Sequence, residues 1–152
     1  MRITETTKRS AIYSFAAAVG LFCLLAAAPA MADLANGTCE TTPDLVADDI
    51  VDLAEDTRMA GMLGIWTRRG HVDPFAGERF ARKLDADPKR AGKPRRGAAT
   101  QLRDGKVDGA LEKLDSYVAG VQKTKVVDAA AQAVADGLAD DAIFLIGCIN
   151  SL

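Results

Sequence analysis

The chain has 152 residues and a formal net charge of −2, with 49% hydrophobic and 26% charged residues. This length suits one domain with a modest core, and the nearly balanced charge argues against a nucleic-acid partner. One histidine and three cysteines argue against a Cys/His metal site. We expect neither a metal nor a cofactor.

The first 32 residues have the layout of a secretory signal peptide. A positively charged start precedes the apolar run Ala11–Ala28, and Ala30-Met31-Ala32 supplies small residues for cleavage. We expect cleavage after Ala32 and a secreted bacterial protein, extracellular or periplasmic, without stable membrane insertion. The alternative is an uncleaved anchor, because the apolar run is nearly long enough to span a bilayer.

Beyond the signal peptide we expect a polar leader at 33–42 and a single helical domain at 43–152. Removal of the signal leaves 16 Lys/Arg against 20 Asp/Glu, a net charge of −4. Cys39 and Cys148 remain near the two ends of this part. In an oxidising compartment such a pair predicts a disulfide; the alternative is two thiols, one of them buried.

The first helix begins at Thr42-Pro43-Asp44, where a capping threonine, a proline and an acid follow one another. Its inner face contains Val46, Ile50 and Leu53. The apolar positions then move to the side that acids occupied before. We therefore predict two helices or a kink near 57–61. The new face consists of Met59, Met62, Leu63 and Trp66.

The next boundary is Arg68-Arg69-Gly70, which is typical of a helix end. Asp73-Pro74 predicts another helix start, and the helix that follows reaches about Ala86. Its inner positions are Phe75, Phe80 and Leu84.

A loop rich in Pro, Gly, Lys and Arg covers 87–97, and a helical hairpin covers 97–121. The hairpin turns at Gly105 and has its apolar stripe on the second helix. An Ala-rich helix at about 126–147 follows. No segment predicts a strand, so we expect an all-α, compact bundle of five or six helices. The stripe comprises Val107, Leu111, Leu114, Val118 and Val121, with Ala110 and Tyr117 beside it.

From about Met59 to Ile149, the chain resembles the FIMAH domain, a helical accessory module of secreted bacterial hydrolases and surface proteins. This resemblance implies a helical fold and no catalytic residues. The matching positions are Arg69-Gly70-His71-Val72, Phe80–Leu84, Gln101-Leu102, Gly105-Lys106, Ala110–Tyr117 and the final Ala-rich helix.

Two groups of residues suggest chemistry, and each has a simpler explanation. His71 and Asp73 have the residue types of an acid/base pair, but an interhelical turn explains them more simply. The acids on the first helix are the ligand type that Ca²⁺ prefers, but a helix face holds carboxylates apart, and a solvated face fits better. They are Asp44, Asp48, Asp49, Asp52, Glu55 and Asp56.

The loop at 87–97 is the main binding candidate. It folds back on the acidic helix, meets anionic envelope polymers or lipid headgroups, or stays solvated. We therefore expect a secreted, non-catalytic helical module that binds a partner protein or an anionic envelope component. The alternatives are a divergent hydrolase and a small inhibitor-like protein. The candidate binding residues are Lys89, Arg90, Lys93, Arg95 and Arg96.

Overall fold

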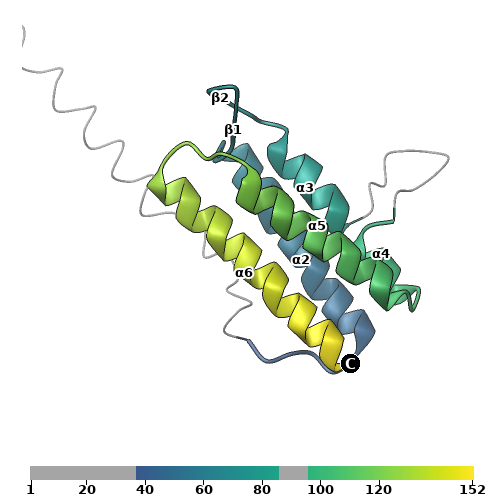
Figure 1. Cartoon of the computed structure of the whole chain (residues 1–152). Coiled ribbons are helices and arrows are strands. Elements are labelled where there is room, and N and C mark those ends of the chain that lie inside the picture. The colour runs from purple at the N-terminus through teal and green to yellow at the C-terminus, as the bar shows by residue number, and fades with distance from the viewer. Residues whose placement is uncertain (1–36, 86–95) are drawn as a thin grey trace, which may run out of the picture. The chain divides into compact units, whose positions relative to one another are not determined.

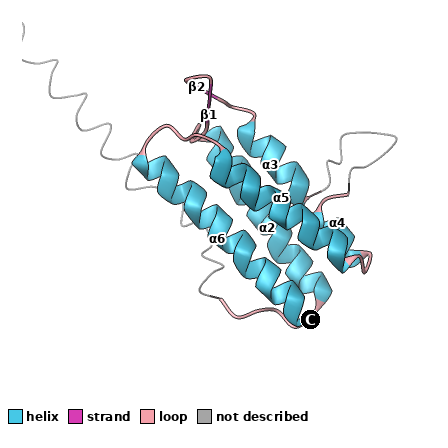
Figure 2. Ribbon diagram, in the orientation of Figure 1, coloured by secondary structure: helices cyan, strands magenta, loops and turns pink. Residues whose placement is uncertain are grey.

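The structure is a computed structural model, and it describes residues 37–85 and 96–152. These residues contain five helices and one short hairpin (Figures 1 and 2). The prediction of an all-α bundle is confirmed, whereas the expected signal peptide lies outside the described residues. The elements are α2 (Pro43–Met62), β1 (Thr67–Arg68), β2 (His71–Val72), α3 (Ala76–Leu84), α4 (Ala98–Arg103), α5 (Val107–Lys123) and α6 (Ala129–Ser151).

The helices pack around one core in which α2 and α5 have the central roles. Both helices contact α3, α4 and α6. Residues Asp33–Leu152 form one compact unit. Within the described ranges, no helix has both the length and the apolarity that crossing a bilayer requires. The largest side chains of the core, all under 2% exposed, include Trp66, Tyr117, Ile50, Leu53, Leu114 and Leu138.

The two longest helices begin at side-chain caps. Thr42 Oγ1 accepts a hydrogen bond from Leu45 N at 3.4 Å, and Pro43 is the first residue of α2. This start is the predicted one. Asp128 Oδ1 accepts from Ala131 N at 2.8 Å, and α6 therefore begins at Ala129 rather than near 126.

The predicted break within the first helix is wrong, because α2 continues to Met62. Its buried face contains Thr57, Ala60 and Gly61, so small and polar side chains carry the inner stripe beyond residue 56. Thr57 remains in the core because its hydroxyl donates to Leu53 O at 2.7 Å. The apolar residues chosen as the new face are mostly outside the core. Met59 is 36% exposed, Met62 80% and Leu63 62%.

A close contact between two glycines explains why small residues occupy this part of α2. A Cβ on Gly61 would lie 2.6 Å from Gly77 Cα. Gly77 belongs to α3, so the two helix backbones touch at this point. Any side chain at either position would force the helices apart. Behind this contact, Trp66 packs edge-on against Phe80, with 5.2 Å between the ring centroids.

The predicted helical hairpin is confirmed as α4 and α5, and Gly105 has the left-handed φ of +71° that the turn needs. The predicted stripe on α5 is correct in part. Leu114 and Val121 are buried, but Val107 is 40% exposed. The core-facing side is rotated toward two residues that had been placed beside the stripe, Ala110 and Tyr117.

The expectation of a strand-free chain is wrong for β1 and β2, which pair Thr67 with Val72 and Arg68 with His71. Between them, Arg69 and Gly70 have φ of +54° and +82°. Two positive φ angles form the tight turn that matches the twist of a hairpin. The residues that resembled a helix C-terminus are therefore a hairpin turn.

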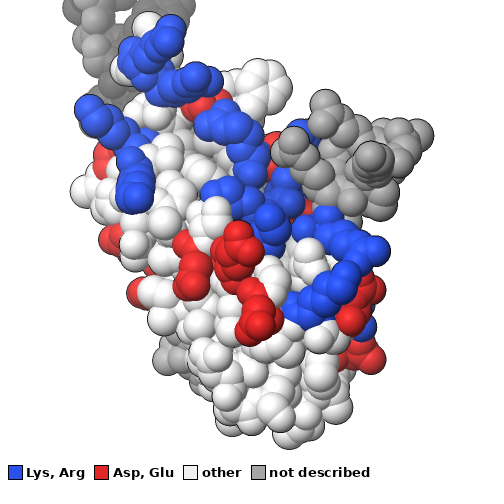
Figure 3. Space-filling model, turned by 45° about the vertical axis from the view of Figure 1, so that its right-hand side comes forward, with Lys and Arg blue, Asp and Glu red and all other residues white. Residues whose placement is uncertain are grey.

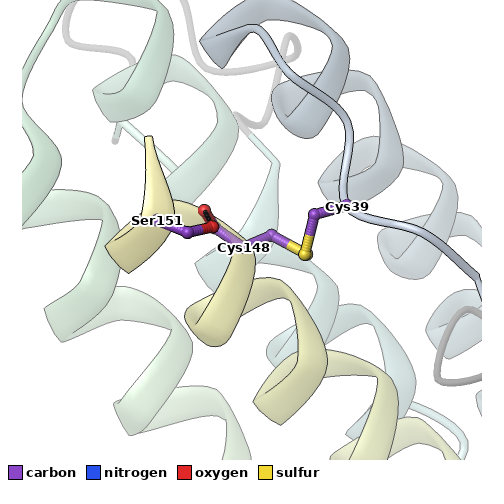
Figure 4. The surroundings of a disulfide bond; sticks show 3 residues. All are labelled: Cys39, Cys148 and Ser151. Atoms are coloured by element: carbon purple, nitrogen blue, oxygen red, sulfur yellow. Dashed lines mark hydrogen bonds between the residues drawn. A yellow bond between two sulfur atoms is a disulfide. The ribbon is translucent and has the colours of Figure 1, made fainter.

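The two ends of the bundle are closed by different kinds of bond. At the hairpin end, Thr67 N donates to Lys125 O at 2.8 Å, and Val127 N donates to Ile65 O at 3.0 Å. At the other end, Cys39 and Cys148 form the predicted disulfide across a sequence separation of 109 residues (Figure 4). The bond joins the segment before α2 to the last turns of α6.

Candidate binding face

The hairpin is lined by cationic side chains around an open pocket. The pocket has a volume of about 390 Å³ and lies beside the Arg69–Gly70 turn. A non-glycine residue with a positive φ, such as Arg69, is uncommon and costs conformational energy. The pocket is lined by Arg68, Arg69, His71, Val72, Asp73 and Pro74.

Asp73 is the acid in this pocket, and Arg79 already binds it. Arg79 Nη1 and Nη2 donate to the two carboxylate oxygens at 3.2 and 2.8 Å, and Phe75 N donates to Oδ1 at 3.1 Å. The hydrogen bonds from Arg79 are the main reason why the pKa of Asp73 is lowered. Because Asp73 turns the chain in this way, α3 begins at Ala76, later than the predicted Asp73-Pro74 start.

The geometry does not support an acid/base pair of His71 and Asp73. His71 is exposed on β2, and both oxygens of Asp73 are bonded to Arg79. A carboxylate held in this way stays ionised and orients no imidazole. The pocket instead presents two arginines and a histidine, a set of donors suited to an anionic group.

Lys83 lies further along α3 and contacts α5. Its Nζ donates to Ser116 O at 2.6 Å and to Ser116 Oγ at 3.0 Å, and it lies 6.0 Å from the centroid of the Phe80 ring. Burial and the nearby charge of Lys113 lower the pKa of Lys83. The charge of Lys113 therefore acts on Lys83 across the packing of α3 on α5.

The contact between Lys83 and Ser116 does not form a nucleophilic site. A serine nucleophile needs a base and also N–H donors aimed at the developing oxyanion. Ser116 lies within α5, where each backbone N–H bonds to the carbonyl one turn earlier. The helix leaves no donor for an oxyanion at this point, so we assign the contact to packing of α3 on α5.

Five cations on the hairpin, α3 and α5 make up what we call the basic face: Arg68, Arg69, Arg79, Lys83 and Lys113. The charge of Arg68 reaches Asp73, which binds Arg79. Arg79 and Lys83 are one turn apart on α3. The positive charge of Lys113 interacts with Lys83 and adds to the effect of burial in lowering its pKa. Figure 3 shows Lys and Arg side chains as a band that runs from the hairpin toward the middle of the molecule.

Most of the basic face lacks acidic partners. Among the described residues, Arg68, Arg69, Lys83 and Lys113 make no ion pair, whereas Arg79 pairs with Asp73. Four uncompensated cations on one side contrast with the negative net charge of the sequence. The surface is therefore strongly polarised.

Of the loop residues predicted to bind, Lys89, Arg90, Lys93 and Arg95 lie outside the described residues. Arg96 is described, and its Nη1 pairs with Asp104 Oδ2 at 2.8 Å. The two attachment points of the loop lie together, since a Cβ on Gly97 would lie 2.6 Å from Leu84 O. The loop therefore leaves and rejoins the bundle at the end of α3.

Of the acids predicted along α2, Asp48 accepts a hydrogen bond from Arg103 of α4, whereas the predicted contact with the basic loop at 87–97 falls mostly on residues outside the described ranges. Arg58, a cation of α2, pairs with Glu78 at 3.2 Å and with Asp85 at 3.6 Å. No group of three or more His, Cys, Asp or Glu side chains is placed to hold a metal ion in the described ranges.

Sequence reasoning missed the hairpin and the cations that surround it. One signal was present, because the β-branched residues Thr67 and Val72 flank an X-Gly pair at hairpin spacing. The meeting of Lys83 with Lys113 had no such signal, since it depends on how α3 packs on α5.

Comparison with known proteins gave no matching family model, no matching curated protein and no matching solved structure. The resemblance to the FIMAH domain therefore stays a prediction from the sequence.

Proposed function

We propose that the protein is a secreted, non-catalytic helical module that binds an anionic component of the cell envelope through the basic face. The observation that carries the proposal is a set of four cations that make no ion pair with any described residue and that span the hairpin, α3 and α5. The disulfide fits an oxidising compartment outside the cytoplasm.

The electrostatics of Lys83 support a binding role for this face. Burial is the main reason why the pKa of Lys83 is lowered, and the positive charge of Lys113 lowers it further by repulsion. A phosphate or carboxylate bound between them would relieve this repulsion. A polymer with repeated negative charges could reach this pair and the pocket at the hairpin at the same time, and each added contact would strengthen binding.

For the test, the protein is secreted by an expression host that has an oxidising secretory pathway. Immobilised inorganic polyphosphate is the anionic probe. We expect binding that weakens as salt is added. The variant Arg68→Gln/Lys113→Gln should bind about tenfold more weakly or worse, since each basic group near an anionic surface contributes on the order of 1 kcal/mol.

The matched control is Arg103→Gln/Lys106→Gln, which removes the same charge at the α4–α5 turn. This control should retain most of the binding, because the lost charges lie outside the basic face. Equal losses in the two variants would show that net charge matters and the face does not. Failure of the unaltered protein to bind either polyphosphate or vesicles of anionic phospholipid would overturn the proposal.

A further inference from the structure

We propose that the hairpin end is a docking surface for an anionic lipid bilayer, with Met62, Leu63, Val72 and Phe75 entering the headgroup region while Arg68 and Arg69 bind lipid phosphates. This inference rests on the proposed function, because it names one anionic partner for the basic face. We call these six residues, together with His71, the docking tip.

The first argument is the exposure of the apolar side chains. Met62 is 80% exposed, Phe75 70%, Leu63 62% and Val72 54%. Scattered single apolar residues are normal on a protein surface, but a cluster of large ones marks an interaction site. These four are the most exposed large apolar residues in the described part of the chain.

The second argument is that the four side chains share one end of the bundle. Met62 ends α2 and Leu63 follows it. A Cβ on the next residue, Gly64, would lie 2.9 Å from Val72 Cγ1, so Val72 lies over the turn that ends α2. Phe75 immediately precedes α3, whose Gly77 touches Gly61 of α2. Figure 1 shows the hairpin at the same end as the start of α3.

The third argument is that the fold presents these side chains rigidly. Ile65 and Trp66 are buried directly after Leu63, and Ala76 is buried directly after Phe75. The buried neighbours anchor the backbone on both sides of the docking tip. The apolar groups are therefore presented on an anchored backbone, so binding does not have to order the backbone of the docking tip.

The fourth argument is charge. Arg68 and Arg69 lie between the apolar segments in sequence, at the turn of the hairpin, and neither makes an ion pair within the described residues. Arginine has a long stem that lies along apolar material while its guanidinium reaches a phosphate. Apolar groups beside cations suit an interface with anionic lipids. A water-soluble polymer offers the arginines a partner but gives the apolar side chains none.

The experiment measures co-sedimentation with vesicles of phosphatidylglycerol and phosphatidylcholine, and with vesicles of phosphatidylcholine alone. The apolar variant is Met62→Ser/Phe75→Ser. Because both side chains are mostly exposed, the fold should tolerate the change. Its matched control is Leu45→Ser/Ile143→Ser, which removes apolar groups 45% and 49% exposed elsewhere on the surface.

We expect the apolar variant to bind anionic vesicles at least tenfold more weakly, since two large side chains lose their apolar surroundings. The control should bind as the unaltered protein does. Arg68→Gln/Arg69→Asn should also bind at least tenfold more weakly, and asparagine suits the left-handed conformation at 69. Arg103→Gln/Lys106→Gln should leave vesicle binding largely intact.

Binding to polyphosphate separates this inference from the proposed function. The apolar variant should keep its affinity for polyphosphate, because no cation is removed. If the unaltered protein binds polyphosphate but not anionic vesicles, the docking inference is overturned and the proposed function stands. If neither probe is bound, both are overturned. Vesicle binding that the apolar variant retains in full, or that is as strong without phosphatidylglycerol, would also overturn the docking inference.

Discussion

At the disulfide end of the bundle, the bond between Cys39 and Cys148 joins the segment before α2 to the last turns of α6. At the hairpin end, backbone hydrogen bonds from Thr67 and Val127 join the segment after α2 to the segment before α6. The first end is covalently closed. The second leaves large apolar side chains in solvent, together with two exposed arginines that make no ion pair in the part of the chain that the structure describes. In the function proposed above, the difference means that the disulfide end supplies stability and the hairpin end supplies the binding surface.

This separation explains two features that stability alone does not. Exposed Met62 and Phe75 contribute little to the core, and a positive φ at Arg69 carries a conformational cost. Both features persist because the surrounding structure supports them. The glycine contact of α2 with α3 and the buried Trp66 lie directly beneath the hairpin end.

The largest expected effect comes from breaking the closed end. Cys39→Ser/Cys148→Ser removes a bridge between residues separated by 109 positions, and loop-closure entropy then gives a loss of about 4–5 kcal/mol. Urea unfolding, monitored by circular dichroism, would measure this loss. Reduction of the unaltered protein should reproduce it. Vesicle binding by the folded fraction should persist, and a simultaneous loss of binding by folded protein would contradict the separation.

The second effect tests the support beneath the hairpin end. Gly61→Ala places a methyl group against the backbone of Gly77, which cannot move without separating the helices. We expect a decrease of about 1–3 kcal/mol in the free energy of unfolding. Gly137→Ala is the control, since no heavy atom lies within 4 Å of its Cβ position. That change should stabilise α6 by roughly 0.5–1 kcal/mol. If Gly61→Ala changed the free energy of unfolding as Gly137→Ala does, the contact between Gly61 and Gly77 would be refuted.

A smaller effect is expected in the core that both ends share. Thr57 donates its hydroxyl hydrogen to Leu53 O, so the 2.7 Å contact with Tyr117 uses the tyrosine hydroxyl as donor. Tyr117→Phe leaves the Thr57 oxygen without that donor and should cost about 1 kcal/mol. Burial raises the pKa of Tyr117, so its absorbance should show no tyrosinate in mildly alkaline folded protein. Titration of Tyr117 near the ordinary tyrosine value would contradict the burial.

The smallest effect concerns pH at the hairpin end. The pKa of Asp73 is lowered mainly by hydrogen bonds from Arg79. The stabilisation is therefore fully present above the unfolded pKa of about 3.9 and is lost as pH falls through the lower folded value. Urea midpoints of the unaltered protein and Asp73→Asn should differ at pH 6 and converge in strong acid. A difference that grows with acidification would show the opposite linkage.

How much of this structure was predictable depends on the range of each interaction. The start of α2, the turn at Gly105 and the α4–α5 pair follow from local capping and periodicity, and they were predicted. The disulfide followed from cysteine number and compartment. The continuous α2 was missed because its buried face continues through Thr57, Ala60 and Gly61, and the close contact of Gly61 with Gly77 of α3 is one that no local pattern reveals.

The candidate face was predicted less well than the fold. The sequence directed attention to the basic loop, whose described member Arg96 pairs with Asp104. Lys83 and Lys113 lie on two helices that are remote in sequence and packed against each other, which brings their charges within range of interaction. Arg68 and Arg69 were read as a helix end, because cations followed by glycine also have that local meaning.

The most direct test of the separation is to map amide resonances of the ¹⁵N-labelled protein with and without phosphatidylglycerol nanodiscs. We expect shifts or broadening at 62–75 and along the exposed side of α3. We expect little change around Cys39 and the last turns of α6. Changes concentrated at the disulfide end, or confined to 86–95 with an unchanged hairpin, would contradict the assignment of binding to the hairpin end.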